Sequence, residues 1–246
     1  MRLNNKIAIV TGGGSGFGSG IVKKFAKEGA KVIVADIHIE NAQEVANSNG
    51  AIAVEVDVSN SLSFKNLVSS TFEKFGKIDI IVNNAGITHT PKKMEDISEE
   101  EFDRIFSVNS KSVFLSAKYL VPLMTSNGGG NILNIASTAG ISPRPNLSWY
   151  NATKGWMISA TKAMAIELAP KKIRVNALAP VAGETPLLKS FMGGDTPEKR
   201  EKFLSTIPIG RFSTPDDMGN AACFLCSEEA SMITGVILEV DGGRCI

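Results

Sequence analysis

The sequence predicts an α/β fold in which a seven-stranded parallel sheet carries helices on both faces. Short apolar runs rich in β-branched residues alternate with amphipathic stretches over 246 residues, and this alternation is typical of parallel sheets with crossover helices. A glycine-rich turn joins the first apolar run to the first amphipathic stretch, as in doubly wound folds of the Rossmann type. We therefore expect a three-layer sandwich with strand order 3-2-1-4-5-6-7 and three helices on each face.

Each expected strand is a short continuous apolar run, which suits a strand buried on both faces of a sheet. The seven runs lie at residues 6–10, 31–35, 51–56, 78–82, 131–135, 173–178 and 236–240. The stretches between them have amphipathic patterns that predict helices. These helices are expected at residues 16–28, 39–47, 62–75, 99–124, 148–168 and 215–226.

One segment, residues 182–209, breaks this alternation. It is rich in Gly, Pro, Met and charge, and it is too long for a plain connection. It could be a mobile lid or a surface insertion. The lid is favoured because the segment follows the carboxyl end of a strand, where open α/β sheets bind ligands. The chain shows no repeat or linker, so we expect one domain over residues 1–246.

Composition excludes several classes of partner. Lys and Arg number 26 and Asp and Glu number 25, so no net field attracts nucleic acid or an anionic membrane. We find no secretion signal and no apolar segment of the roughly 18 residues that a membrane span needs. These absences predict a cytoplasmic protein with neither a nucleic-acid nor a membrane partner.

Cysteine and histidine offer no metal site. Cys223 and Cys226 form a CxxC pair, which could be a redox pair, half of a zinc site or two core residues of a helix. The core is favoured because no second ligand pair follows and no strand places a thioredoxin-like turn. His38 and His89 fall in polar loops and are expected to be solvated. No catalytic metal is expected.

The glycine-rich turn, TGGGSGFG at residues 11–18, lies between a strand and a helix. Glycine lets the backbone approach a pyrophosphate, and the helix terminus receives its negative charge. Asp36 ends the second strand, where a carboxylate can bind both hydroxyls of an adenosine ribose and repel a 2′-phosphate. This predicts NAD rather than NADP. Asp57 and Val58 could border the adenine, or Asp57 could cap the helix that begins near residue 61.

Tyr150 and Lys154 are four residues apart in an expected helix, so they share one face. An isolated tyrosine has a pKa of about 10. A nearby ammonium favours the phenolate and is expected to draw that pKa toward working pH. With a nucleotide-phosphate cradle, this pair indicates an enzyme that transfers a hydride and moves a proton through tyrosine.

The glycine turn, Asn83-Asn84-Ala85-Gly86, Asn109, Ser137 and Tyr150-x-x-x-Lys154 occur in a characteristic order and spacing. With them the chain resembles the short-chain dehydrogenase/reductase family over essentially its whole length. It looks most similar to bacterial 3-oxoacyl-(acyl-carrier-protein) reductases and to related alcohol and sugar dehydrogenases. The resemblance implies a single dinucleotide-binding catalytic domain and an oxidoreductase that interconverts a ketone and a secondary alcohol.

The same resemblance implies roles for four catalytic residues. Ser137 would donate to the substrate carbonyl oxygen and Tyr150 would transfer the proton. Lys154 would lower the pKa of the tyrosine and bind the nicotinamide ribose. Asn109 would hold a water that relays protons to Lys154, or it could be a packing exception or helix-bend residue. The implied cofactor-binding residues are Gly12, Gly14, Ser15, Gly16, Phe17, Gly18, Asp36, Asp57, Val58, Asn84, Ala85, Gly86, Tyr150, Lys154, Pro180, Val181 and Thr185.

Two departures from the family pattern bear on the substrate. Val181 stands where relatives usually have glycine after Pro180, and we expect it to supply backbone contacts in the carboxamide-binding turn that Thr185 completes. Carrier-protein reductases tend to present basic residues near the mouth of the site. Here only Lys171 and Lys172 are candidates.

Three functions therefore stay open at this point. The first is a 3-oxoacyl-thioester reductase, with acyl carrier protein as a partner. The second is an NAD-dependent dehydrogenase of a small alcohol or sugar, and the third is a non-catalytic dinucleotide sensor. The expected helices at residues 99–124 and 148–168 carry apolar residues on more than one face, which indicates pairing with other copies of the chain. The resemblance implies that the assembly is a homotetramer. The apolar residues are Phe106, Val113, Leu120, Trp156 and Met164.

Overall fold

The centre of the structure, a computed structural model that describes residues 1–246, is one sheet of seven strands. All neighbouring strands are parallel and their order is β3-β2-β1-β4-β5-β6-β7, as predicted. The observed boundaries lie within two residues of the expected ones. The strands are β1 Ile7–Thr11, β2 Lys31–Asp36, β3 Ile52–Glu55, β4 Ile80–Asn83, β5 Gly130–Ile135, β6 Ile173–Pro180 and β7 Ile237–Val240.

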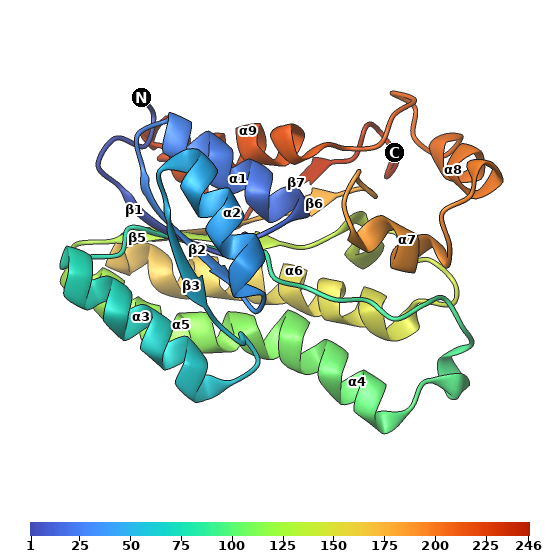
Figure 1. Ribbon diagram of the computed structural model, residues 1–246, viewed down its shortest axis with the longest axis horizontal. Helices are drawn as coiled ribbons and strands as arrows, with labels where there is room; N and C mark the ends of the chain where they lie inside the picture. The colour runs from blue at the N-terminus through green and yellow to red at the C-terminus, as the bar shows by residue number, and fades with distance from the viewer.

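Helices cover both faces of this sheet (Figure 1). On one face α1 (Gly16–Lys27), α2 (Ile39–Asn49) and α9 (Pro215–Cys226) pack over an apolar core. On the other face lie α3 (Ser61–Phe75), α4 (Glu99–Phe106), α5 (Ser112–Ser126) and α6 (Ser148–Leu168), and α3, α5 and α6 pack over a second core. The three-layer α/β sandwich is therefore confirmed.

The helix expected at residues 99–124 is interrupted by a π-helical turn, Ser107–Lys111, between α4 and α5. The prediction of one uniform helix is wrong here. Apolar periodicity cannot reveal the extra residue, because the pattern resumes after it. Asn109 lies in this turn and is fully buried. Such turns are frequent at functional sites, where they re-aim a side chain.

The segment at residues 182–209 contains two short helices, α7 (Leu187–Met192) and α8 (Pro197–Leu204). Thr196 caps α8 by accepting from the Lys199 amide. Apolar side chains of both helices join a small cluster that includes Tyr150. In Figure 1 the two helices lie beyond the carboxyl ends of the strands.

Burial agrees with the cysteine prediction and corrects one histidine prediction. Cys223 and Cys226 are buried in α9, among the core residues of that face. His38 is exposed as expected, but His89 is buried with its Nδ1 2.8 Å from the carbonyl oxygen of Thr90. No helix combines the length and apolar content that crossing a membrane requires. The cytoplasmic location stays a prediction.

Candidate active site

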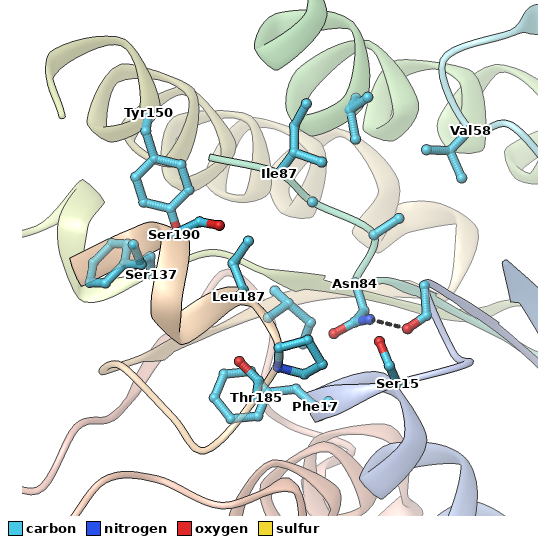
Figure 2. Close-up of a pocket in the computed structure, with 18 of the residues that line it drawn as sticks. Ser15, Phe17, Val58, Asn84, Ile87, Ser137, Tyr150, Thr185, Leu187 and Ser190 are labelled. Carbon is cyan, nitrogen blue, oxygen red and sulfur yellow. Dashed lines mark hydrogen bonds between the residues drawn. The ribbon is translucent and has the colours of Figure 1, made fainter. Parts of the chain in front are cut away.

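A cleft of about 630 Å³ opens at the carboxyl ends of the strands. Residues of β2, β5 and β6 and of the turns that follow β1, β3 and β4 line it, together with residues of α1, α4, the π turn, α6 and α7. Figure 2 shows Ser137 and Tyr150 toward one end, and Ser15 and Asn84 toward the other. The cleft therefore runs from the glycine turn to the predicted proton-transfer residues.

The glycine turn is shaped by contacts that larger residues would prevent. Gly16 has φ +53°, which a residue with a Cβ rarely adopts. A Cβ on Gly18 would collide with the carbonyl oxygen of Gly12. Ser15 precedes α1 and makes no capping hydrogen bond with its side chain. The first amides of α1 are thus free to receive an anion.

Asn84 fixes this turn from the neighbouring strand. Its Nδ2 donates to the carbonyl oxygens of Thr11 (2.9 Å) and Gly12 (3.0 Å). The Thr11 hydroxyl donates to Val82 and accepts from the Asn84 and Ala85 amides. Asn84 therefore holds β1 and β4 together beneath the cleft, in addition to lining it.

Asp36 lies at the end of β2 and lines the cleft beside the glycine turn. Its Oδ2 accepts from the Gly14 amide at 2.9 Å, and its Oδ1 accepts from the His38 amide at 3.1 Å. Each oxygen keeps lone pairs for further donors. The carboxylate is thus oriented by the backbone and remains able to accept hydrogen bonds from a ligand.

Asp57 lines the cleft with Val58, but it does not cap the helix that follows. Its Oδ1 accepts from the amide (2.9 Å) and hydroxyl (2.7 Å) of Ser59. Asn60 caps α3 instead, by accepting from the amides of Leu62 and Ser63. The capping alternative for Asp57 is therefore wrong, because the helix begins later than that carboxylate can reach.

Ser137, Tyr150 and Lys154 come together from β5 and α6. Ser137 follows β5, and Tyr150 and Lys154 are one turn apart in α6. Lys154 Nζ donates to the Ile135 carbonyl oxygen at 2.8 Å and lies 5.9 Å from the centroid of the Tyr150 ring. All three side chains are buried and all three line the cleft.

The expected direction of the tyrosine pKa shift is not found. Burial raises the pKa of Tyr150 to about 12, while the Ser137 hydroxyl acts in the opposite direction. Burial also lowers the pKa of Lys154 to about 8. The expectation rested on the effect of the ammonium, but desolvation disfavours the charged form of both groups and is the larger effect at this buried site.

Asn109 does not line the cleft. Its Oδ1 accepts from the Ile87 amide at 2.9 Å, and its Nδ2 donates to the Ile87 carbonyl oxygen at 2.9 Å and to Thr153 Oγ1 at 3.1 Å. The side chain thus clamps the segment after β4 to α6. This contact explains why the π turn directs Asn109 inward.

The turn after β6 lines the cleft through Pro180, Val181 and Thr185, as predicted. The backbone groups of Val181 are already engaged, however. Its amide donates to Val240 (3.3 Å) and its carbonyl oxygen accepts from Ser213 Oγ (3.1 Å). The backbone contacts expected of Val181 are therefore made within the protein.

Of the predicted site residues, Gly14, Gly18 and Asn109 shape the cleft without lining it. Other lining residues belong to no motif and were not predicted. Several of them lie in α7, the first helix of the 182–209 segment. The unpredicted lining residues are Ile37, His38, Val56, Ser59, Ile87, Arg104, Ser107, Val108, Ile135, Ala136, Ala182, Gly183, Pro186, Leu187, Leu188, Ser190 and Phe191. The placement of 182–209 after a strand end was the one available signal for those in α7.

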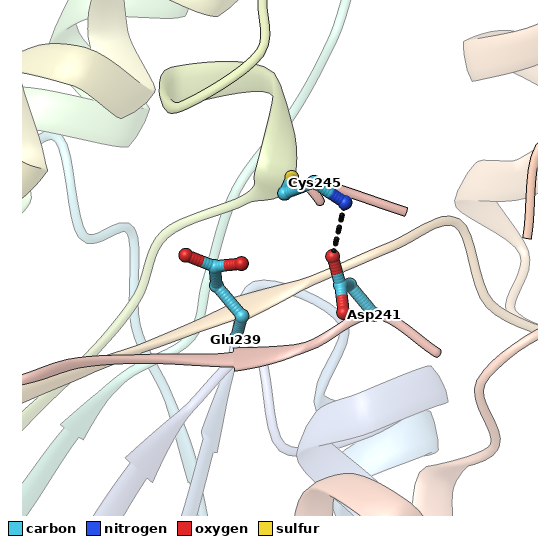
Figure 3. A group of neighbouring side chains, drawn as sticks. All are labelled: Glu239, Asp241 and Cys245. Atoms are coloured by element: carbon cyan, nitrogen blue, oxygen red, sulfur yellow. Dashed lines mark hydrogen bonds between the residues drawn. The ribbon is translucent and has the colours of Figure 1, made fainter. Parts of the chain in front are cut away.

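Outside the cleft, Glu239, Asp241 and Cys245 bring ligand-type atoms within 4.8 Å of one another (Figure 3). The two Asp241 oxygens already accept from the amides of Gly243 (2.9 Å) and Cys245 (2.8 Å). Turn geometry accounts for the cluster, and none of its three residues lines the cleft.

Comparison with known proteins identifies the family. The family model described as enoyl-(acyl carrier protein) reductase matches residues 12–244. The 4-formylbenzenesulfonate dehydrogenase TsaC1/TsaC2 of Comamonas testosteroni is 46% identical over 252 residues, with 100% of each chain covered. The chain belongs to the short-chain dehydrogenase/reductase family. It is an oxidoreductase of that family, as the motifs predicted.

Two further relatives are described as reductases of carrier-protein substrates. The 3-oxoacyl-[acyl-carrier-protein] reductase FabG of Thermotoga maritima is 39% identical over 252 residues, with 100% of each chain covered. A crystal structure of 3-ketoacyl-(acyl-carrier-protein) reductase from Brucella melitensis complexed with NADH is 53% identical. It matches with a TM-score of 0.95 and covers 99% of this chain and 100% of that one.

Proposed function

We propose that this short-chain dehydrogenase/reductase uses NADH to interconvert a small carbonyl compound and its alcohol. One observation carries the proposal. Ser137, Tyr150 and Lys154 line the same cleft as the glycine turn and Asp36. Figure 2 shows Ser137 and Tyr150 toward one end of it and Ser15 toward the other. One cleft thus contains both the proton-transfer group and the residues that would bind a dinucleotide.

In the proposed reaction Ser137 donates a hydrogen bond to the substrate carbonyl oxygen. Tyr150 gives its proton to that oxygen during reduction and takes it back during oxidation. A dinucleotide bound at the glycine turn would supply or accept the hydride. Lys154 stabilises negative charge on the phenolate, and Asn109 holds the Ile87 segment against α6 and relays protons through a water to Lys154.

The residues present fit a dinucleotide. The uncapped amides of α1 and the turn at Gly12, Ser15, Gly16 and Phe17 would receive the pyrophosphate. Asp36 would accept from the hydroxyls of the adenosine ribose and would repel a 2′-phosphate. The relative from Brucella is described as complexed with NADH, which supports this cofactor.

The position of Lys171 and Lys172 favours a small substrate over a carrier-linked one. These lysines precede β6, whereas the cleft lies at the carboxyl end of that strand, where Pro180 is found. An eight-residue strand spans about 26 Å at roughly 3.3 Å per residue. Within one chain they therefore cannot flank the mouth. The Comamonas relative is named for a small aromatic aldehyde.

Carrier docking remains the second candidate, since two relatives are described as carrier-protein reductases. The two candidates differ in salt dependence, because exposed charge contacts are screened over about 10 Å at 0.1 M salt. We expect free and carrier-linked acetoacetyl substrates to be reduced with similar salt dependence. A carrier-linked substrate that is strongly preferred at low salt, with Lys171→Glu and Lys172→Glu abolishing the preference, would favour the carrier-linked function.

We propose that the 182–209 segment acts as the substrate lid of one catalytic domain. Phe191 of α7 lines the cleft, and its ring lies 5.7 Å from that of Tyr150 in an edge contact. The lid therefore covers the proton-transfer end of the cleft and leaves the Asp36 end to the cofactor.

The rate of carbonyl reduction should fall as pH rises through about 8. The pKa of Lys154 is lowered to about 8 by burial, so its ammonium is present below that pH and lost above it. Without the ammonium the phenolate formed by proton donation is less stable. In Lys154→Arg the cation persists, so the fall near pH 8 should disappear even if the rate is lower. A wild-type reduction rate that stays flat from pH 7 to 10 would contradict this role.

We propose a homotetramer, on a set of residues that only partly overlaps the expected one. Val113 and Leu120 are buried within the chain, and Phe106 and Met164 are partly buried. The exposed apolar residues on α5 and α6 are Phe114 (54%), Trp156 (40%) and Ile166 (80%). Phe114 and Trp156 line a shallow groove with Phe106. Such a surface is typical of an interface between copies.

Light scattering at micromolar concentration should give the mass of four chains. Phe114→Asp places a charge in the proposed interface and should lower the measured mass, whereas Met232→Asp, at an exposed methionine elsewhere, should not. A wild-type protein that stays monomeric would refute the tetramer.

A further inference from the structure

Arg144 lies behind the lid with no counterion. The carbon at the centre of its guanidinium is 5.0 Å from the ring centroid of Phe191 and 4.4 Å from that of Phe203. Its Nη1 is buried without a hydrogen-bond partner. Burial lowers the pKa of this guanidinium, as does the charge of Arg244. The side chain as a whole is half-buried, and a partly desolvated cation without a counterion is unfavourable unless an anion joins it.

The loop that carries Arg144 is held in place. Pro143 and Pro145 flank the residue and restrict its backbone. The Arg144 carbonyl oxygen accepts from Asn151 Nδ2 at 2.7 Å, and the Asn146 carbonyl oxygen accepts from the Lys92 amide at 3.1 Å. The cation is therefore positioned by its backbone rather than by an ion pair.

A second arginine approaches the same aromatic ring from the C-terminal turn. The guanidinium carbon of Arg244 lies 5.4 Å from the Phe203 centroid. Asp241 fixes the backbone on either side of Arg244 by accepting from the Gly243 and Cys245 amides. Figure 3 shows the second of these bonds. Two guanidinium groups thus lie near the same ring and repel each other, and a bound anion would offset this repulsion.

Neighbouring carboxylates of the lid do not neutralise this pair. Glu184 and Asp195 both bind Arg200, at 2.9 Å and 2.5 Å. The guanidinium of Arg144 is also close to the predicted proton donor Tyr150, because Phe191 contacts both residues. Arg144 itself does not line the cleft, whereas Phe191 does. A substrate in the cleft therefore reaches the guanidinium when the Phe191 side chain moves aside.

We propose that Arg144, assisted by Arg244, binds an oxyanion on the substrate, so that the enzyme selects carbonyl compounds carrying a carboxylate, sulfonate or phosphate about one ring away from the reacting carbon. Guanidinium donors match the geometry of these groups. The inference rests on the proposed function, because it assigns the substrate class of the same cleft.

The test compares matched substrates with NADH. One pair is 4-formylbenzoate and its methyl ester, and the other is 4-formylbenzenesulfonate and its sulfonamide. Wild-type enzyme should prefer each anion by at least about tenfold in kcat/KM, as expected for a charge-assisted contact. A carboxylate preference and a sulfonate preference distinguish the two oxyanions.

Arg144→Met should raise KM for the anions about tenfold or more while changing KM for the neutral partners less than about threefold. Arg144→Lys should restore part of the preference, and Arg244→Met should weaken it without altering the loop that holds Arg144. Lys189→Met is the matched control, because it removes one charge from the exposed side of α7.

The alternative role for Arg144 is to attach the lid by stacking on its aromatic rings. In that case Arg144→Met would slow anionic and neutral substrates equally, and this result would overturn the proposal. Turnover of the neutral compounds with no anion preference would also overturn it, while leaving the oxidoreductase function intact. The opposite outcome can also be recognised. If no compound is turned over, but benzenesulfonate raises the Tm of wild type and not that of Arg144→Met, the proposed function is rejected and the anion site stands.

Discussion

Replacing Tyr150 with phenylalanine is expected to lower turnover by about 10²–10⁴-fold, the usual range for positioned acid–base catalysis. That loss corresponds to roughly 3–5 kcal/mol of barrier. The ring contact with Phe191 is retained, so folding and cofactor binding should survive. Steady-state rates and a fluorescence titration of NADH measure the two properties separately.

The other tyrosine provides a matched control. Tyr119 bonds Ser61 through its hydroxyl at 2.7 Å and does not line the cleft, so Tyr119→Phe should keep near wild-type turnover. Lys154→Met should impair both turnover and cofactor binding. Turnover of Tyr150→Phe close to that of wild type would refute the assigned proton donor.

Asp36→Asn is expected to narrow the preference for NADH over NADPH by about 10- to 100-fold, the equivalent of roughly 1.4–2.7 kcal/mol. The carboxylate repels a 2′-phosphate through its charge. Asparagine removes the charge but keeps one oxygen to accept from the Gly14 amide, a bond of 2.9 Å in the native chain. The cofactor ratio of kcat/KM reports this change.

Comparing Asp36→Ala with Asp36→Asn separates the two effects of the carboxylate, which are repulsion of a 2′-phosphate and support of the glycine turn. Asp36→Ala removes both effects, so KM for NADH should rise further than in Asp36→Asn. Asp57→Asn is the control, because Asp57 lines the cleft but is engaged by Ser59. An unchanged NADH to NADPH ratio in both Asp36 variants would show that Asp36 does not select the cofactor.

The sheet could be predicted because every strand is a separate apolar run. Strand order follows from crossover rules and from the glycine turn, which places β1 at the centre. The π turn could not be predicted in this way, because the apolar periodicity of the helix continues on both sides of Asn109. Its cause is a tertiary contact with Ile87.

The site could be predicted where residue type and spacing carry chemistry, as with Ser137, Tyr150 and Lys154. The positions of the charged residues relative to the cleft could not be predicted, because they depend on distance along a strand and on burial. Lys171 and Lys172 are near the site in sequence but lie at the opposite edge of the sheet. Arg144 belongs to no motif, and its unpaired state becomes visible only after Phe191 and Phe203 enclose it.

The central claim is that one cleft binds NADH and carries out carbonyl reduction. Absorbance of the nicotinamide, followed with wild-type protein and a panel of ketones, aldehydes and acyl thioesters, tests it most directly. We predict NADH oxidation that depends on the carbonyl compound and is lost in Tyr150→Phe. Tight NADH binding with no oxidation by any member of the panel, and no NAD reduction by the corresponding alcohols, would contradict the claim and indicate a dinucleotide sensor.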